Sequence, residues 1–280
     1  MGEPGEFLSK EQREYMKGIA LQEAQKGINR MLKDALGLGP SGRKTFGDGF
    51  LSMELSYKPS TTSYIRPPIE EELRRDITCS QCGLEHAVFG LANRCPDCGA
   101  DIFLLHVEKE FEVIKVMLSD LDRRHALFGA RVAAHDIENA LEDAVSVFEA
   151  SARAMIRRYL RGSGTPDAEV EEFVAKKIGN RLQTASLAEA VFQEHFPLEL
   201  FADMSTVDKE DFSQIFQKRH PITHNLGIVD RKYVLRSSTN ELEGRDVRVS
   251  LAEVLKAIEL SERILLRLHA SLKLGNDPTT

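Results

Sequence analysis

The spacing of apolar residues divides the chain into helical and extended stretches. In residues 9–36, apolar side chains recur at the three- and four-residue intervals of an amphipathic helix, with Ser9 as its expected N-cap. The residues expected on its buried face are Ile19, Ala20, Ala24, Ile28, Met31, Leu32 and Ala35. Glycines at 37–42 end this helix, and alternating apolar positions in 50–66 then predict a strand-like extension.

Helical periodicity dominates the chain from residue 105 onward. We expect helices over 105–127, 131–161, 167–182, 186–195, 207–226 and 250–274. Residues 227–248 lack a helical period, and Tyr233-Val234-Leu235 predicts a short strand within them. Because consecutive helices with short connections pack against one another, they predict an antiparallel helical bundle.

All four cysteines occur in two Cys-x-x-Cys-Gly pairs, Cys79 with Cys82 and Cys95 with Cys98. Each glycine permits the left-handed backbone that such a turn uses. Disulfides or a redox dithiol are alternatives, but the matched pairs favour a four-thiolate metal site resembling a zinc ribbon. We expect one structural Zn²⁺ per chain, and four thiolates leave that ion no open position for catalysis.

These patterns predict three parts. Residues 1–75 hold the N-terminal helix plus the strand-like extension, 76–104 form the four-cysteine zinc ribbon, and 105–280 form the bundle. The expected fold class is therefore mostly α, an antiparallel helical bundle with a small β zinc-ribbon subdomain and an N-terminal helix.

Composition narrows the classes of function. The chain has 280 residues, of which 42% are hydrophobic and 29% charged, as is ordinary for a globular protein. Its net charge of −7 argues against sequence-independent binding of a nucleic-acid duplex, although a small basic cleft is compatible with it. Neither a long apolar run nor a secretory signal is evident, so we expect a cytoplasmic protein without membrane association.

The glycine-rich segment contains two patterns that resemble nucleotide-binding loops. Gly37, Gly39 and Gly42 match G-x-G-x-x-G, and the segment up to Thr45 resembles a phosphate loop. The glycines follow a predicted helix rather than a strand, and Arg43 interrupts the phosphate-loop pattern. We therefore expect a flexible turn here and no nucleotide site.

A cation and two imidazoles stand close together in Arg219-His220-Pro221-Ile222-Thr223-His224-Asn225. Arginine stabilises anionic charge, and histidine transfers protons near neutral pH. On a straight helix Arg219 and His224 would lie about 140° apart, so we expect a kink at Pro221 or a second subunit to bring them together. His220 and His224 also have the spacing of a helical metal pair, although Pro221 stands where the zincin motif needs Glu.

Arg219-x4-His224, the polar residue after the arginine, Asn225 and the stretch 227–230 on a late bundle helix resemble the HEPN superfamily over about 105–275. The resemblance implies a metal-independent endoribonuclease that forms a homodimer. It implies that Arg219 and His224 are catalytic, that His220 assists them, and that Asn225 binds substrate. It also implies a role in antiviral defence, toxin–antitoxin pairs or RNA processing, with a possible regulatory or antitoxin protein partner.

The expected reaction is attack of a ribose 2′-OH on the adjacent phosphorus, leaving 2′,3′-cyclic phosphate and 5′-OH ends. The alternative is a non-catalytic HEPN-like module that binds a partner protein, RNA or nucleotide. A second match to the motif, Arg263-x5-His269, lies in an apolar run, and we interpret it as helix packing plus surface charge.

Overall fold

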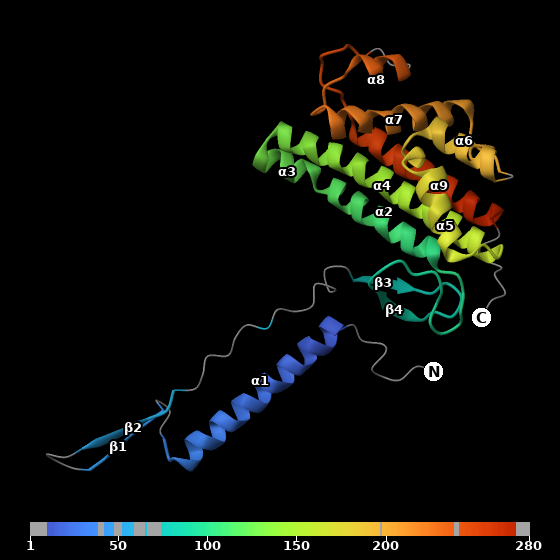
Figure 1. Ribbon diagram of the computed structural model, residues 1–280. Helices are drawn as coiled ribbons and strands as arrows, with labels where there is room; N and C mark the ends of the chain where they lie inside the picture. Colours follow the sequence, from blue (N-terminus) through green and yellow to red (C-terminus); the bar gives the residue numbers. More distant parts are fainter. Residues whose placement is uncertain are drawn as a thin grey trace. The chain divides into compact units, whose positions relative to one another are not determined.

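A computed structural model describes residues 10–38, 42–47, 52–58, 65, 74–196, 198–237 and 241–272. The chain divides into two compact units, Met1–Arg74 and Arg75–Thr280. The described residues are mostly helical, with two small antiparallel sheets of two strands each (Figure 1). None of the described helices is long and apolar enough to cross a membrane.

The first unit begins with α1 (Lys10–Ala35), which confirms the helix expected over 9–36. Ser9, its expected N-cap, lies outside the described residues. The buried face expected for α1 is wrong, since Ile28 and Met31 are 56% and 72% exposed. Another side of the helix packs within this unit. A Cβ at Gly18 would lie 2.9 Å from Cδ1 of Ile65, so the absent side chain allows this close approach.

A hairpin of β1 (Arg43–Phe46) and β2 (Met53–Ser56) follows, with Arg43 opposite Ser56 and Phe46 opposite Met53. The expected turn extended to Thr45, but the strand already begins at Arg43. This strand is short and polar, so the sequence showed no alternation of apolar residues there. Of the extension expected over 50–66, the structure describes 52–58 and 65, and only Met53–Ser56 is strand. Gly42 has φ +69°, and a Cβ there would lie 2.8 Å from the Tyr57 carbonyl oxygen.

The second unit begins with the cysteine-bearing hairpin, β3 (Arg75–Thr78) paired with β4 (Glu85–Val88). Asp101 joins this segment to the bundle, because its carboxylate accepts a hydrogen bond from Arg158 and pairs with Nε2 of His269 at 3.2 Å. Burial alone raises the pKa of Asp101, but the hydrogen bonds from His269 and Arg158 outweigh it and lower the pKa to about 2.

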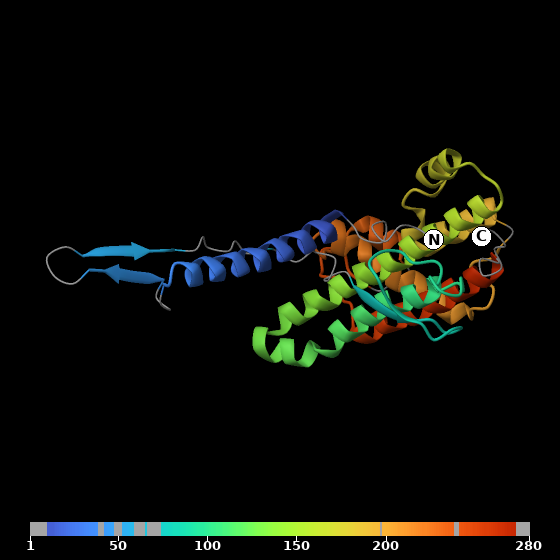
Figure 2. The same cartoon turned by 90° about the horizontal axis from the view of Figure 1, so that it is seen from below.

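Long helices form the bundle. They are α2 (Phe103–Ser119), α3 (Leu121–Phe128), α4 (Ala130–Gly162) and α9 (Leu251–Ser271). Figures 1 and 2 show α2, α4 and α9 running alongside one another. The single helix expected over 105–127 is two helices, separated at Asp120. Gly129, with φ +89°, reverses the chain so that α4 packs back along α3 and α2.

Shorter elements and α7 complete the second unit. They are α5 (Asp167–Phe173), a π-helical turn (Val174–Ile178), a 3₁₀ turn (Arg181–Gln183), α6 (Ala185–His195), α7 (Thr206–His224) and α8 (Arg231–Arg236). The continuous helix expected over 167–182 is therefore wrong, because it breaks into three pieces. Rings of α4 and α7 form part of the core, where the Phe148 centroid lies 5.4 Å from those of Phe212 and Phe216.

The strand expected at 233–235 is wrong, because α8 occupies these residues. Asp230 explains the difference. Its Oδ1 accepts a hydrogen bond from the Tyr233 amide at 2.6 Å, which caps the first turn of a short helix. β-Branched and aromatic residues favour strands on average, but a capping aspartate and the burial of Tyr233 favour a helix here.

Candidate functional site

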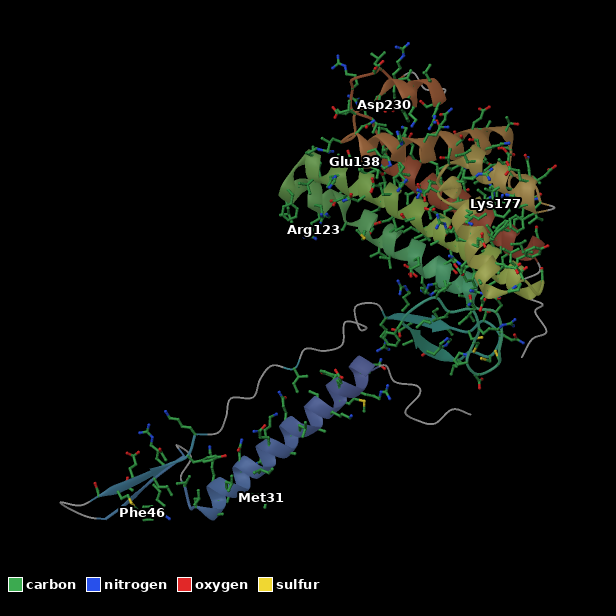
Figure 3. All side chains as sticks on the ribbon, viewed as in Figure 1. Met31, Phe46, Arg123, Glu138, Lys177 and Asp230 are labelled. Carbon is green, nitrogen blue, oxygen red and sulfur yellow. The ribbon has the colours of Figure 1, made fainter. Side chains whose placement is uncertain are left out.

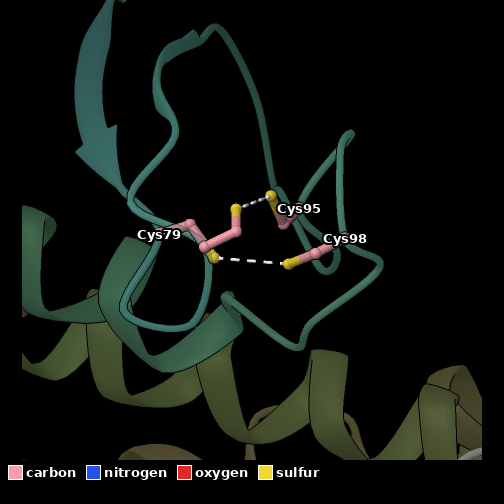
Figure 4. Close-up of side chains that lie close together, drawn as sticks. Cys79, Cys95 and Cys98 are labelled. Carbon is pink, nitrogen blue, oxygen red and sulfur yellow. Dashed lines mark hydrogen bonds between the residues drawn. The ribbon is translucent and has the colours of Figure 1, made fainter.

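The four cysteine sulfurs converge at the tip of the β3–β4 segment, and Figure 4 shows the contacts between them. All four lie within 4.8 Å of one another, and the Cys79–Cys98 and Cys82–Cys95 Sγ pairs are both 3.7 Å apart. A tetrahedron with metal–sulfur bonds of about 2.3 Å has edges of about 3.8 Å. The donor set and its dimensions therefore fit one tetrahedral metal ion.

The two cysteine turns have matching backbones. The Gly83 amide donates to the Cys79 carbonyl at 2.9 Å, and the Gly99 amide donates to the Cys95 carbonyl at 3.0 Å. Gly83 and Gly99 have φ values of +74° and +70°, which confirms the left-handed geometry expected after each second cysteine.

The thiols differ in acidity. Amide N–H groups of Cys82 and Gln81 point at Cys79 and lower the pKa of its thiol to about 6. The Leu84 amide lowers the pKa of the Cys82 thiol. Burial and the sulfurs of Cys98, Cys79 and Cys95 outweigh this effect and raise that pKa to about 12. Four crowded sulfurs resist ionising together, and a divalent cation between them would remove that resistance.

Arg219, His220 and His224 line one cavity of about 360 Å³. Residues of the 3₁₀ turn, α6 and α8 complete its wall, among them Gln183 and Arg236. Arg219 and His224 thus reach the same space within one chain, although their helical positions differ by about 140°. The helix runs from Thr206 through Pro221 to His224, and the cavity extends along its last two turns.

A chain of hydrogen bonds holds the Arg219 side chain. Its Nη1 donates to Oε1 of Gln183 at 2.9 Å, and Nε2 of Gln183 donates to Oε2 of Glu149 at 2.7 Å. Glu149 also pairs with Arg153 of the same helix. Among the described residues nothing accepts a hydrogen bond from the buried Nε of Arg219.

Gln183 is a site residue that the sequence did not indicate. It lies 36 positions before Arg219 and belongs to no motif. It reaches the site because the helix that begins at Asp167 breaks at the π-helical turn, and such turns are frequent at functional sites. Gly179-Asn180, a pair typical of helix ends, was the available signal, and Gly179 has φ +49°.

The two histidines of α7 lie together, with ring centroids 5.1 Å apart and planes inclined by 57°. Burial and the neighbouring His224 lower the pKa of His220, and Asp230 opposes this shift only in part. This shift favours the neutral imidazole of His220, which can accept a proton. His224 ends the helix with an exposed side chain.

Asn225 makes a contact outside the cavity wall. Its Nδ2 donates to Oδ2 of Asp230 at 2.7 Å, and Figure 3 shows Asp230 at the start of α8. The Tyr233 amide and Asn225 together lower the pKa of Asp230. Asn225 thus helps to fix α8, which carries Tyr233 and Arg236 to the cavity.

The second arginine–histidine match is divided between two unrelated contacts. Nη1 of Arg263 donates to Asp208 at 3.1 Å, whereas His269 pairs with Asp101 and stacks on Phe103, with centroids 6.3 Å apart. Both residues are used in packing and surface charge, as the sequence indicated.

No family model matches the chain, and neither a curated protein nor a solved structure matches it.

Proposed function

We propose that the chain is a metal-independent endoribonuclease whose bundle is HEPN-like. The observation that carries this proposal is the shared cavity of Arg219, His220 and His224. A fixed guanidinium, a neutral imidazole and a second imidazole within one pocket are the groups that cleavage by a ribose 2′-OH requires.

In the proposed reaction, His220 takes the proton of the ribose 2′-OH as its oxygen attacks phosphorus. The bond between phosphorus and the 5′-oxygen breaks, and His224 gives a proton to that leaving oxygen. Arg219 binds the non-bridging oxygens and stabilises the charge that grows on them. Because Gln183 accepts a hydrogen bond from Nη1 of Arg219, the guanidinium is already oriented when phosphate binds.

Positive charge on α8 supports an anionic substrate. Arg236 lines the cavity, and Lys232 and Arg236 both oppose protonation of His220, so their charges act at the site. The net charge of the chain is −7, so this local positive charge would favour a short stretch of RNA at the cavity over extended contact with a duplex.

The test is cleavage of mixed-sequence RNA without added divalent metal by the wild type, Arg219→Ala and His224→Ala. Arg263→Ala provides a matched control, because this arginine belongs to the second motif match and contacts Asp208. We expect each cavity variant to lose about 10²-fold or more in rate and the control to retain it. Equal cleavage by all four proteins would refute the proposal. RNA binding without cleavage would favour the non-catalytic module.

We further propose that the ion held by the four cysteines is Zn²⁺, with a structural role. Four thiolates suit Zn²⁺ and saturate its coordination, so the ion would brace the turns without meeting substrate. Elemental analysis should find one zinc per chain, and Cys98→Ser should lower that content. A folded full-length chain that binds no metal would refute this assignment.

A further inference from the structure

A stripe of apolar side chains on α1 faces solvent. Its residues are Leu21, Ala24, Ile28, Met31 and Ala35, at alternating three- and four-residue intervals. All five are exposed, and Leu21, Ile28 and Met31 expose 69%, 56% and 72% of their surface. This spacing is typical of a helix that packs along its length against another helix.

The hairpin of the same unit packs on a different side of α1. Tyr57 donates a hydrogen bond to Oδ1 of Asn29, which lies about 120° around the helix from the centre of the stripe. Ile65 lies close to Gly18, also away from that centre. Among the described residues of this unit, the helix therefore presents Asn29 to the hairpin and Gly18 to Ile65, and nothing covers its most apolar side.

The positions that flank the stripe carry no charge between residues 18 and 32. They are Gly18, Ala20, Gln25, Gly27 and Leu32. Charged residues occupy the outer side, where Lys26 and Glu23 pair at 2.6 Å. On one edge of the stripe the small residues Ala20 and Gly27 let a second helix approach closely, and the exposed charges keep the remaining surface hydrated.

We propose that this stripe pairs with the same stripe of a second copy of the chain in an antiparallel arrangement. Charge decides the direction. The same heptad frame places Lys17 about one turn and Glu14 about two turns before Leu21 on the stripe. Parallel helices would set Lys17 against Lys17 and Glu14 against Glu14, which is unfavourable in a seam.

The antiparallel arrangement avoids these like-charge contacts and matches side-chain size. Leu21 meets Met31 of the second copy, and Ala24 meets Ile28, so four apolar layers form about a two-fold axis. At each end Lys17 lies beside Asp34 of the second copy, and opposite charges meet twice. The pairing concerns α1 alone and does not depend on whether the bundle cleaves RNA.

The test is sedimentation of the full-length chain over a concentration series. We expect a dimer whose dissociation constant rises about tenfold in Lys17→Glu and in Asp34→Lys, and returns toward the wild-type value in the double variant. Parallel pairing predicts no rescue by the double swap. Met31→Glu, which places a carboxylate in the apolar layers, should leave a monomer.

As a control, circular dichroism should give each variant the helix content of the wild type. A monomeric wild type, a Met31→Glu dimer of unchanged affinity, or a double swap that does not restore pairing would overturn the proposal. Cleavage of RNA by a Met31→Glu monomer would separate the two proposals, because it would show that catalysis does not require this pairing.

Discussion

At the residue scale, the candidate site depends on how Arg219 is held. A free arginine side chain loses considerable conformational entropy when it binds an anion, whereas a hydrogen-bonded one has already lost part of it. Gln183 fixes one nitrogen of the guanidinium by accepting its hydrogen bond. The arrangement is thus prepared for an oxyanion before substrate arrives.

Replacing Gln183 tests this positioning role. Gln183→Leu removes the hydrogen bond to Arg219 while preserving approximate size, so we expect kcat for RNA cleavage to fall about tenfold to 10²-fold with little change in KM. The pH profile should keep its shape, since no titrating group is removed. Gln193→Leu, at an exposed glutamine of α6, is the matched control. A loss confined to KM would show that Gln183 serves binding alone.

His220 makes stability depend on pH in a direction that its environment sets. Burial and His224 depress its pKa below the ordinary value of 6.5, so protonation favours the unfolded chain. The stability that neutral His220 contributes to the folded chain is complete above pH 6.5 and is lost as pH falls through the depressed pKa. Between pH 7.5 and pH 5 the free energy of unfolding, measured with urea, should therefore fall more for the wild type than for His220→Gln. A difference independent of pH would contradict this account.

At the element scale, the long periodic segments were predictable and the irregular ones were not. α4 and α9 each carry a continuous apolar stripe, and the predicted 131–161 and 250–274 agree with them to within one to three residues at either end. α8 was mistaken for a strand because its six residues are too few for a helical period, and its formation depends on the Asp230 cap. The Gln183 contact depends on where the preceding helix breaks.

The same limit explains the error about α1. Its periodicity correctly predicted a helix, but periodicity indicates only that a face is apolar and does not identify what covers it. The cysteine cluster was the opposite case, because two pairs of thiolates at short spacing restrict the geometry locally. Arg219, His220 and His224 were likewise identified from a local motif, whereas their shared cavity needed the tertiary fold.

Asp101 connects the cysteine segment to the bundle, and its substitution tests that connection. Its pKa of about 2 lies below the ordinary 3.8, so the associated stability is fully present at pH 7 and is lost only as pH falls from about 4 toward 2. We expect Asp101→Asn to reduce the unfolding free energy at pH 7 by about 2 kcal/mol. Asp97→Asn, an exposed position in the second cysteine turn, should change it little.

At the scale of the whole molecule, metal binding and folding should be linked. The four sulfurs belong to the same compact unit as the bundle, and Asp101 follows the last cysteine by three residues. Removing the ion with a strong chelator should lower the melting temperature of the full chain by several degrees, and added Zn²⁺ should restore it. Cys98→Ser should show the lower value without chelator. If neither the chelator nor added Zn²⁺ changed the melting temperature, the proposed linkage between metal binding and folding would be contradicted.

The proposed activity of the cavity of Arg219, His220 and His224 is cleavage of RNA through the ribose 2′-OH. The most direct measurement uses a pool of random-sequence DNA strands that each contain one ribonucleotide, without divalent metal, and identifies the product ends by mass. We predict cleavage only on the 3′ side of the ribonucleotide, with a 2′,3′-cyclic phosphate on one product and a 5′-hydroxyl on the other. Cutting between deoxyribonucleotides, or a product with a 5′-phosphate, would contradict the mechanism.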